Sequence, residues 1–326
     1  MTDPGLATPA VRRHLEAAYG LALEGLADHQ IAAAATAAAG EGRVDPADAA
    51  FLARVVDHLP IDESWLFRED SLWEWLRDDA GPALLEAAAL AQRPVRILSL
   101  GCSGGQEAFS AAILFQGLLE RVGFPASAAA GYVQVTGLDS SPARIEAARS
   151  GFIPAWSVQR ARGDWLRGRV AADGDAPGRF RVEPAVAAMC RFEVGNLLDV
   201  VERGNAALGG FDVVLCRHVL IYFRPAEAER LAAGLARGLD RGALLAFSAA
   251  EAHLLGASGT VEPLGQLGAG RIGAGATAAA SPAAGGRALG KPPARLGRKG
   301  RAGAPRTRPP SDAVSSHVRV AVEHAR

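Results

Sequence analysis

The clearest chemical feature of this 326-residue chain is a glycine-rich turn with the sequence LSLGCSGGQE. Gly101, Gly104 and Gly105 carry no side chain, so the backbone at the turn can approach a ligand closely. A helix that begins directly after the turn would present free N–H groups to that ligand. The turn is therefore typical of a site for a nucleotide-like cofactor.

A carboxylate stands at the end of the next apolar run. The segment YVQVTGLD ends at Asp139, 38 residues after Gly101. In dinucleotide-binding folds an acid at a strand end accepts hydrogen bonds from ribose hydroxyls, usually about 20 residues beyond the glycines. The longer spacing here requires a long loop, which GFPASAAAGY would form. The alternative is a structural turn followed by a surface aspartate.

The same turn also matches the G-x-S-x-G nucleophile elbow of serine hydrolases. Ser103 would then be the nucleophile, Asp199 or Asp212 the acid, and His218 or His253 the base. Only helical sequence precedes the first strand, however, and the chain has no HGGG-like oxyanion segment. The sequence therefore favours the cofactor site over the hydrolase.

Short apolar runs alternate with helix-forming segments from Val95 onward. The run VRILSL, bounded by Pro94 and the glycine cluster, is typical of a strand buried on both faces. After it we predict a helix at 105–122, a strand at 132–139, a helix at 142–151, strands at 190–199 and 211–223, a helix at 226–239 and a strand at 243–249. This alternation predicts an α/β fold with a parallel, doubly wound sheet.

Further segments surround this core, which we place at 91–255. Residues 1–60 are rich in alanine and leucine and predict a small helical N-terminal domain. Residues 61–90 predict a linker helix, interrupted at Gly81-Pro82. Polar and turn residues at 153–190 predict an inserted antiparallel subdomain. Glycine, alanine, proline and arginine dominate 256–326, for which we predict a basic, low-complexity, disordered tail.

The net charge of zero conceals an asymmetry. Residues 1–255 carry 24 Lys+Arg against 32 Asp+Glu, whereas residues 256–326 carry 11 against 3. The main body therefore lacks the positive excess that nucleic-acid binding requires, and we expect no nucleic-acid partner.

The chain contains no run of eighteen apolar residues free of charges and helix breakers, and no apolar segment follows a basic start. We therefore expect no membrane insertion and a cytoplasmic location. The three cysteines are far apart and form no CxxC pair, so we expect reduced thiols and no metal site.

Two segments outside the glycine turn carry a family resemblance. DESWLFRED at 62–70 and FDVVLCRHVLIYF at 211–223 resemble the hallmark segments of the CheR-type chemoreceptor glutamate methyltransferases, which are similar to NETYFFRD and FDLIFCRNVLIYF. GCSGGQEAFS resembles that family's GCSTGEEPYS, and NLLD at 196–199 matches it. The motifs follow the family order from about Ala50 to His253.

By this resemblance the chain is identified as a member of that family. The resemblance implies a Rossmann-like class I methyltransferase sheet with an N-terminal helical domain and a small inserted subdomain. It also implies S-adenosyl-L-methionine as cofactor, no metal, and glutamate methyl esters on a chemoreceptor as product. Two alternatives remain: a catalytically impaired, cofactor-binding signalling scaffold, and a methyltransferase of the same fold with a different acceptor.

The resemblance also assigns roles to residues around the amino-acid end of the cofactor. Asp62, Ser64 and Arg68 would contact this end, with Arg68 facing its carboxylate. Gly101 belongs to the glycine turn, and Glu107 corresponds to the family's second acid after the turn.

The remaining assignments follow in the same way. Asp139 would hold the ribose, Asn196 and Leu197 would flank the adenine, and His218 with Val219 would line the methionine side.

Tyr222 and Arg68 are the residues that the resemblance implies for catalysis, Tyr222 lying beside the methyl-transfer position. Four positions depart from the family pattern: Asp62 and His218 replace asparagines, Ser64 replaces a threonine, and Gln106 replaces the first glutamate after the glycines. We expect His218 to donate and accept hydrogen bonds in place of asparagine.

Overall fold

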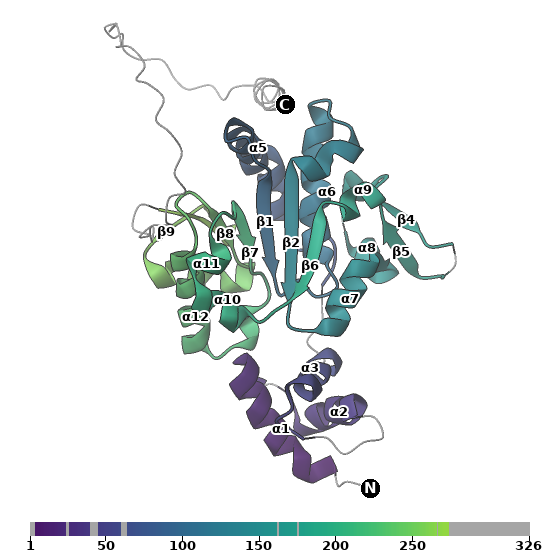
Figure 1. Cartoon of the computed structure of the whole chain (residues 1–326), viewed down its shortest axis with the longest axis vertical. Coiled ribbons are helices and arrows are strands. Elements are labelled where there is room, and N and C mark those ends of the chain that lie inside the picture. Colours follow the sequence, from purple (N-terminus) through teal and green to yellow (C-terminus); the bar gives the residue numbers. More distant parts are fainter. Residues whose placement is uncertain are drawn as a thin grey trace, which may run out of the picture.

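A computed structural model describes residues 4–23, 26–39, 45–59, 64–161, 163–174, 176–265 and 267–273. Figure 1 shows an α/β body with three helices beneath one end of its sheet, the end at which the parallel strands finish. Asp62 lies outside the described residues.

Seven of the described strands form one sheet in the order β6-β2-β1-β7-β8-β10-β9. Their bounds are Val95–Leu100 (β1), Val133–Asp139 (β2), Cys190–Val194 (β6), Val213–Leu215 (β7), Leu244–Ala246 (β8), Val261–Pro263 (β9) and Ala269–Ile272 (β10). The first five strands are parallel, and β10 runs antiparallel to both of its neighbours. The predicted α/β fold of the class I methyltransferase type is confirmed.

The chain reverses its direction of travel across the sheet between β1 and β7. It passes from β1 to β2 and then β6 on one side, and returns to place β7 and β8 on the other. In such sheets the ligand binds beyond the carboxyl ends of the strands at the reversal. The topology therefore points to the ends of β1, β2 and β7.

Helices cover both faces of the sheet, because the strands are buried on both faces. In β1, Ile97 belongs to one buried cluster and Leu98 to the other. The described helices of this body are α4 (Asp70–Trp75), a π-helical segment (Leu76–Ala80), α5 (Gly81–Leu90), α6 (Gln106–Arg121), a 3₁₀ segment (Ala126–Gly131), α7 (Pro142–Ser150), α10 (Leu197–Arg203), α11 (Asn205–Leu208), a 3₁₀ turn (Leu220–Tyr222), α12 (Pro225–Gly238) and a long 3₁₀ segment (Ala249–Ser258).

The N-terminal helices α1 (Pro4–Tyr19), α2 (Asp28–Ala39) and α3 (Ala49–His58) bury an apolar cluster of their own. The helical character predicted for this part of the chain is therefore confirmed, while its separation as a domain stays a proposal. The segment after α1 touches the main body, because Leu21 bridges Phe223 and the Ala22 N–H donates to the Tyr222 carbonyl at 2.6 Å.

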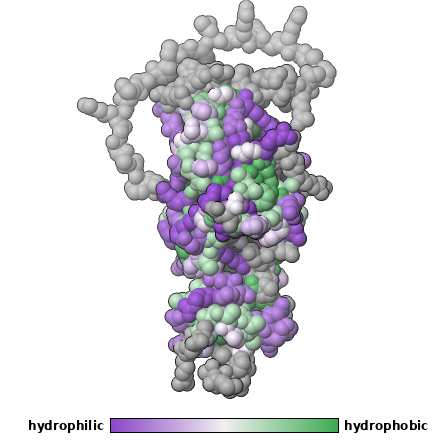
Figure 2. Space-filling view, turned by 90° about the vertical axis from the view of Figure 1, so that its right-hand side faces the viewer, coloured by the Kyte–Doolittle hydropathy of each residue, from purple (hydrophilic) through white to green (hydrophobic). Residues whose placement is uncertain are grey.

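Between β2 and β6 the chain forms a second, three-stranded antiparallel sheet in the order β3-β5-β4. Its elements are β3 (Phe152–Pro154), α8 (Ala155–Arg160), a 3₁₀ turn (Gly163–Leu166), β4 (Val170–Ala172), β5 (Arg179–Val182) and α9 (Pro184–Ala187). The segment predicted as an insertion thus contains an antiparallel sheet. Figure 2 looks at this side of the molecule and shows a hydrophobic patch bordered by hydrophilic surface.

Two predicted strands are much too long. The strand predicted at 190–199 ends at Val194, because the side chain of Asn196 accepts the Leu198 N–H at 3.0 Å and begins α10. The strand predicted at 211–223 ends at Leu215. The Cys216 N–H still donates to the Ala246 carbonyl of β8, but the N–H groups of His218 and Val219 donate to the Glu251 carboxylate and not to a neighbouring strand. Apolar runs alone do not distinguish these turns from strand.

The predicted tail begins too early. Residues 256–273 contain β9 and β10, and β10 pairs with β8 inside the main sheet. These strands have only three and four residues, which hides them from pattern analysis. Position 270 requires glycine, because a Cβ there would lie 2.2 Å from a methyl carbon of Val261. The rest of the predicted tail lies outside the described residues.

The predicted interruption at Gly81-Pro82 is also wrong, because helical backbone continues from α4 to α5. Proline has no N–H to donate, and the turn before it widens so that the Gly81 N–H bonds to the Leu76 carbonyl. Within the described residues, no helix is both long and apolar enough to span a membrane.

Ser141 joins the N-terminal helices to the main body. Its buried hydroxyl accepts the Arg144 N–H at the start of α7 and donates to the Asp57 carboxylate of α3. We expect Ser141→Ala to lower the free energy of unfolding by about 1–2 kcal/mol, because a helix cap and a charged partner are lost together. Urea unfolding followed by circular dichroism measures this, with the exposed Ser150→Ala as control; equal midpoints for the two variants would contradict it.

Candidate functional site

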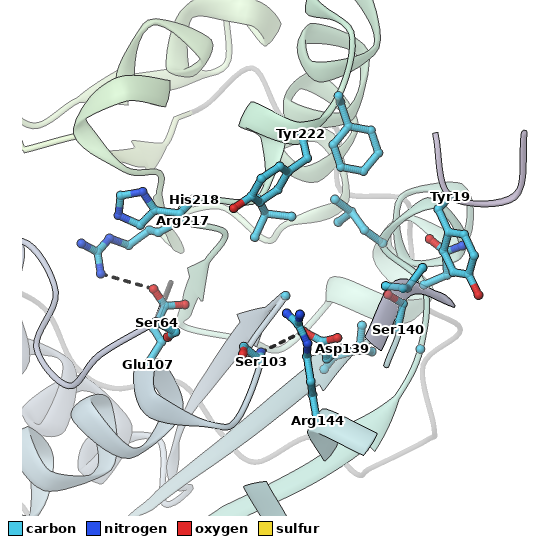
Figure 3. A pocket seen from close by; sticks show the side chains of 18 of the residues that line it. Tyr19, Ser64, Ser103, Glu107, Asp139, Ser140, Arg144, Arg217, His218 and Tyr222 are labelled. Carbon is cyan, nitrogen blue, oxygen red and sulfur yellow. Dashed lines mark hydrogen bonds and ion pairs between the residues drawn. The ribbon is translucent and has the colours of Figure 1, made fainter. Parts of the chain in front are cut away.

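A pocket lies where β1, β2 and β7 end, at the reversal of the sheet (Figure 3). Ten of the eleven residues predicted from the sequence line it: Ser64, Arg68, Gly101, Glu107, Asp139, Asn196, Leu197, His218, Val219 and Tyr222. The structure therefore brings together residues that are spread over some 160 positions of the chain.

The glycine turn is held in place by Asp139. One carboxylate oxygen accepts the Ser103 N–H at 2.8 Å and the other accepts the Ser141 N–H at 2.9 Å. Ser103 has a left-handed backbone (φ 51°), and so has Gly101 (φ 65°), where a Cβ would lie 2.5 Å from a methyl group of Val219. Glycine at position 101 thus allows the turn to pack directly against the loop after β7.

Arg217, at the end of β7, is the buried cation of the site. Its side chain is 1% exposed and lies 3.3 Å from Glu107 and 2.9 Å from Glu69. The same guanidinium also donates to the Arg68 carbonyl at 2.6 Å. It thereby connects β7, α6 and the segment before α4, which all contribute to the pocket wall.

Glu107 is the buried acid that faces Arg217. Burial raises the pKa of this carboxyl, while Arg217 and the hydroxyl of Ser99, which donates at 2.8 Å, act in the opposite direction. The pocket thus holds a negative group whose charge depends on its cationic neighbour.

Glu251 organises the loop that carries His218, Val219 and Tyr222. Its carboxylate is 1% exposed and accepts the backbone N–H groups of His218, Val219 and Ile221 at 2.8, 3.0 and 3.1 Å. It also accepts the N–H and hydroxyl of Ser248 at 3.1 and 2.5 Å. The carboxylate replaces the strand partners that this loop lacks.

His218 adopts a left-handed backbone (φ 58°) and turns its ring into the pocket wall. Burial, followed by the positive charge of Arg68, lowers its pKa to about 4. Its buried Nε2 lies 3.5 Å from a Glu69 oxygen and has no hydrogen-bond partner among the described residues. The imidazole is therefore neutral at physiological pH and presents one unpaired nitrogen.

The N-terminal helices complete the pocket. Tyr19, Leu21 and Val56 line it, and Figure 3 shows Tyr19 at the end away from Arg217 and His218. Burial and the nearby Asp57 raise the pKa of Tyr19, which stays neutral. The hydroxyl of Tyr222 points into the pocket from the opposite wall.

Sequence reasoning missed several of these residues, chiefly Arg217, Glu69, Glu251 and Tyr19. The pattern Ser248-x-x-Glu251, a helix capping signature, could have drawn attention to Glu251. Tyr19 carries no comparable signal. In the described part of the chain, no group of three or more His, Cys, Asp or Glu side chains could hold a metal ion.

The pocket coincides with a family match. Residues 62–261 match the model described as "CheR methyltransferase, SAM binding domain". The chain is 35% identical to chemotaxis protein methyltransferase 1 of Pseudomonas aeruginosa over 54% of this chain and 60% of that protein. It is 29% identical to the chemotaxis protein methyltransferase of Vibrio parahaemolyticus over 60% and 66% of the two chains.

A third relative has another name. The chain is 30% identical to the probable biofilm formation methyltransferase WspC of Pseudomonas putida, over 65% of this chain and 46% of that protein. The matches thus span between about half and two thirds of the length of these relatives.

The low pKa of His218 predicts a pH dependence of stability. A histidine near 6.5 when unfolded and about 4 when folded makes the unfolded chain bind more protons between these values. Stability should therefore fall as pH drops from 6.5 to 4, by at most about 1.4 kcal/mol per pH unit for this group. Urea midpoints across this range should depend less on pH in His218→Asn; parallel curves would contradict the assignment.

Replacing Glu251 by glutamine should loosen the loop. One oxygen becomes an NH₂ group that faces N–H donors, so we expect the free energy of unfolding to fall by about 2–3 kcal/mol. The exposed Glu262→Gln on β9 is the matched control for loss of a carboxylate. Equal urea midpoints for the two variants would show that Glu251 does not hold the loop.

Proposed function

Because the chain belongs to the CheR methyltransferase family, as its match over residues 62–261 establishes, we propose that it transfers a methyl group from S-adenosyl-L-methionine to glutamate side chains of chemoreceptor-like signalling proteins. The observation that carries this proposal is the gathering of ten family-assigned residues in one pocket at the sheet reversal. The names of the relatives, chemotaxis protein methyltransferases, support an acceptor that takes part in chemotaxis. A cytoplasmic location is part of the same proposal.

The chemistry of the pocket fits this cofactor. The Asp139 carboxylate suits ribose hydroxyls, and the apolar surface of Leu138, Leu197 and Phe223 suits a flat base. Arg68 and Glu107 provide opposite charges for a carboxylate and an ammonium, and the unpaired Nε2 of His218 provides a further hydrogen bond.

When bound, S-adenosyl-L-methionine supplies a methyl group already activated by its sulfonium. A glutamate acceptor has an ordinary pKa near 4.3 and is ionised at neutral pH, so the protein need not remove a proton. Its task is to orient the carboxylate and to exclude water. Tyr222 performs the first by hydrogen bonding through the hydroxyl that points into the pocket, which Arg68 also lines.

A second candidate function keeps the reaction and changes the acceptor. The relative named for biofilm formation covers as much of this chain as the chemotaxis relatives do. The acceptor would then be a signalling protein outside chemotaxis. Methyl transfer assays with a chemoreceptor fragment and with a fragment of a signalling protein outside chemotaxis distinguish the two candidate functions.

Asp139→Asn tests the cofactor site. The change keeps the size of the side chain and replaces an acceptor oxygen by a donor, so we expect S-adenosyl-L-methionine to bind at least about tenfold more weakly. Calorimetric titration measures this, with the exposed Asp199→Asn as control. An unchanged affinity would remove Asp139 from the site, and cofactor binding by the natural chain without turnover would favour the scaffold alternative.

Tyr222→Phe tests the catalytic assignment. Loss of one hydrogen bond to the acceptor should lower kcat about tenfold or more while the affinity for S-adenosyl-L-methionine stays unchanged. Methyl transfer from labelled cofactor measures kcat, and Tyr132→Phe, whose ring packs on Phe124 outside the pocket, is the control. A variant with full kcat would exclude the hydroxyl from the reaction.

A further inference from the structure

Two cations and two indoles alternate from the pocket to the inserted subdomain. The guanidinium carbon of Arg68 lies 4.4 Å from the centre of the Trp65 ring. That of Arg160 lies 5.0 Å from the same ring and 5.6 Å from the ring of Trp156. Arg68 and Trp65 line the pocket, whereas Arg160 and Trp156 are exposed. We call these four residues the cation–indole row.

The row is held by regular structure. Trp156 and Arg160 are four positions apart on α8 and therefore share a face of the helix. The helix is joined to the pocket wall because the buried Ser157 hydroxyl accepts the Leu66 N–H at 3.2 Å. The outer end of the row is thus fixed relative to the pocket.

Arg160 differs from two arginines of the inserted subdomain that form ion pairs. Arg169 is paired with Glu120 and Glu183, and Arg179 is paired with Asp173. No carboxylate of the described residues lies within ion-pair distance of Arg160, whose contacts are the two indole rings. Stacking uses the faces of a guanidinium and leaves the N–H donors at its edge, which match a planar carboxylate.

We propose that Arg160 and Trp156 form a docking site for a second carboxylate of the acceptor protein, one helical turn from the glutamate that reacts. Residues three or four apart on a helix have Cβ atoms about 5–6 Å apart, so an acidic helix can place one carboxylate in the pocket and the next beyond Trp65. The acceptor is accordingly a helical segment with paired acidic residues. This inference rests on the proposed function for the identity of the reacting group.

The test uses the full chain saturated with S-adenosylhomocysteine and a fluorescein-labelled synthetic helical peptide with two glutamates four positions apart. A matched peptide has glutamine at one of these positions. We expect Arg160→Gln to weaken binding of the two-glutamate peptide about tenfold, measured by fluorescence anisotropy, and to leave the single-glutamate peptide unaffected. Arg181→Gln, which removes an exposed arginine stacked on Phe152 in the same subdomain, should leave both unchanged.

Equal peptide affinity in Arg160→Gln and the natural chain would overturn the docking site, as would an equal loss in Arg181→Gln. Absence of peptide binding by the natural chain would overturn it as well. A changed affinity for S-adenosylhomocysteine in Arg160→Gln would place the residue in the cofactor site instead.

Methyl transfer to the same peptide separates this inference from the proposed function. Peptide binding that depends on Arg160 but is not followed by methyl transfer would support the docking site and contradict the proposed reaction. Methyl transfer with the same KM for the peptide in the natural chain and in Arg160→Gln would support the proposed reaction and contradict the docking site.

Discussion

The carboxylate of Glu251 accepts three backbone N–H groups from the loop after β7, those of His218, Val219 and Ile221, and the geometry of the site depends on this arrangement. Without it, the N–H groups of His218 and Val219 would be buried with no acceptor, which costs about 1–3 kcal/mol for each group. The loop could then not hold the left-handed backbone of His218. The same fixed loop packs Val219 against Gly101 and places Tyr222 at the pocket wall.

Arg217, two residues after β7, is the second buried charge that fixes the geometry of the site. A buried guanidinium is stable only where its charge and donors are matched, and Glu69, Glu107 and the Arg68 carbonyl provide that match. These partners come from the segment before α4 and from α6, so the charge of Arg217 fixes the position of two other elements relative to β7. The result is a pocket wall whose polar groups are positioned before any ligand arrives.

Much of the α/β core could be predicted from the sequence, because strands such as β1 and β2 are rich in apolar residues and alternate with helix-forming segments. The glycine turn and Asp139 could be predicted as a cofactor site from their pattern, whereas Tyr222 could be predicted only through the resemblance, since its chemistry depends on neighbours distant in sequence. Where prediction failed, a side chain had replaced the backbone as hydrogen-bond partner: Asn196 ends one apolar run and Glu251 bends another. The strands β9 and β10 were missed because segments of three and four residues are too short to show a periodicity.

The hydrogen bond from the Ala22 N–H to the Tyr222 carbonyl joins two stretches of backbone: the segment directly after α1 and the loop after β7. Backbone groups cannot rotate away from a partner as side chains do, so a tilt of α1 displaces the carbonyl of Tyr222, and a displacement of that residue tilts α1. The position of the three N-terminal helices is therefore coupled to the position of the loop after β7 through the backbone itself.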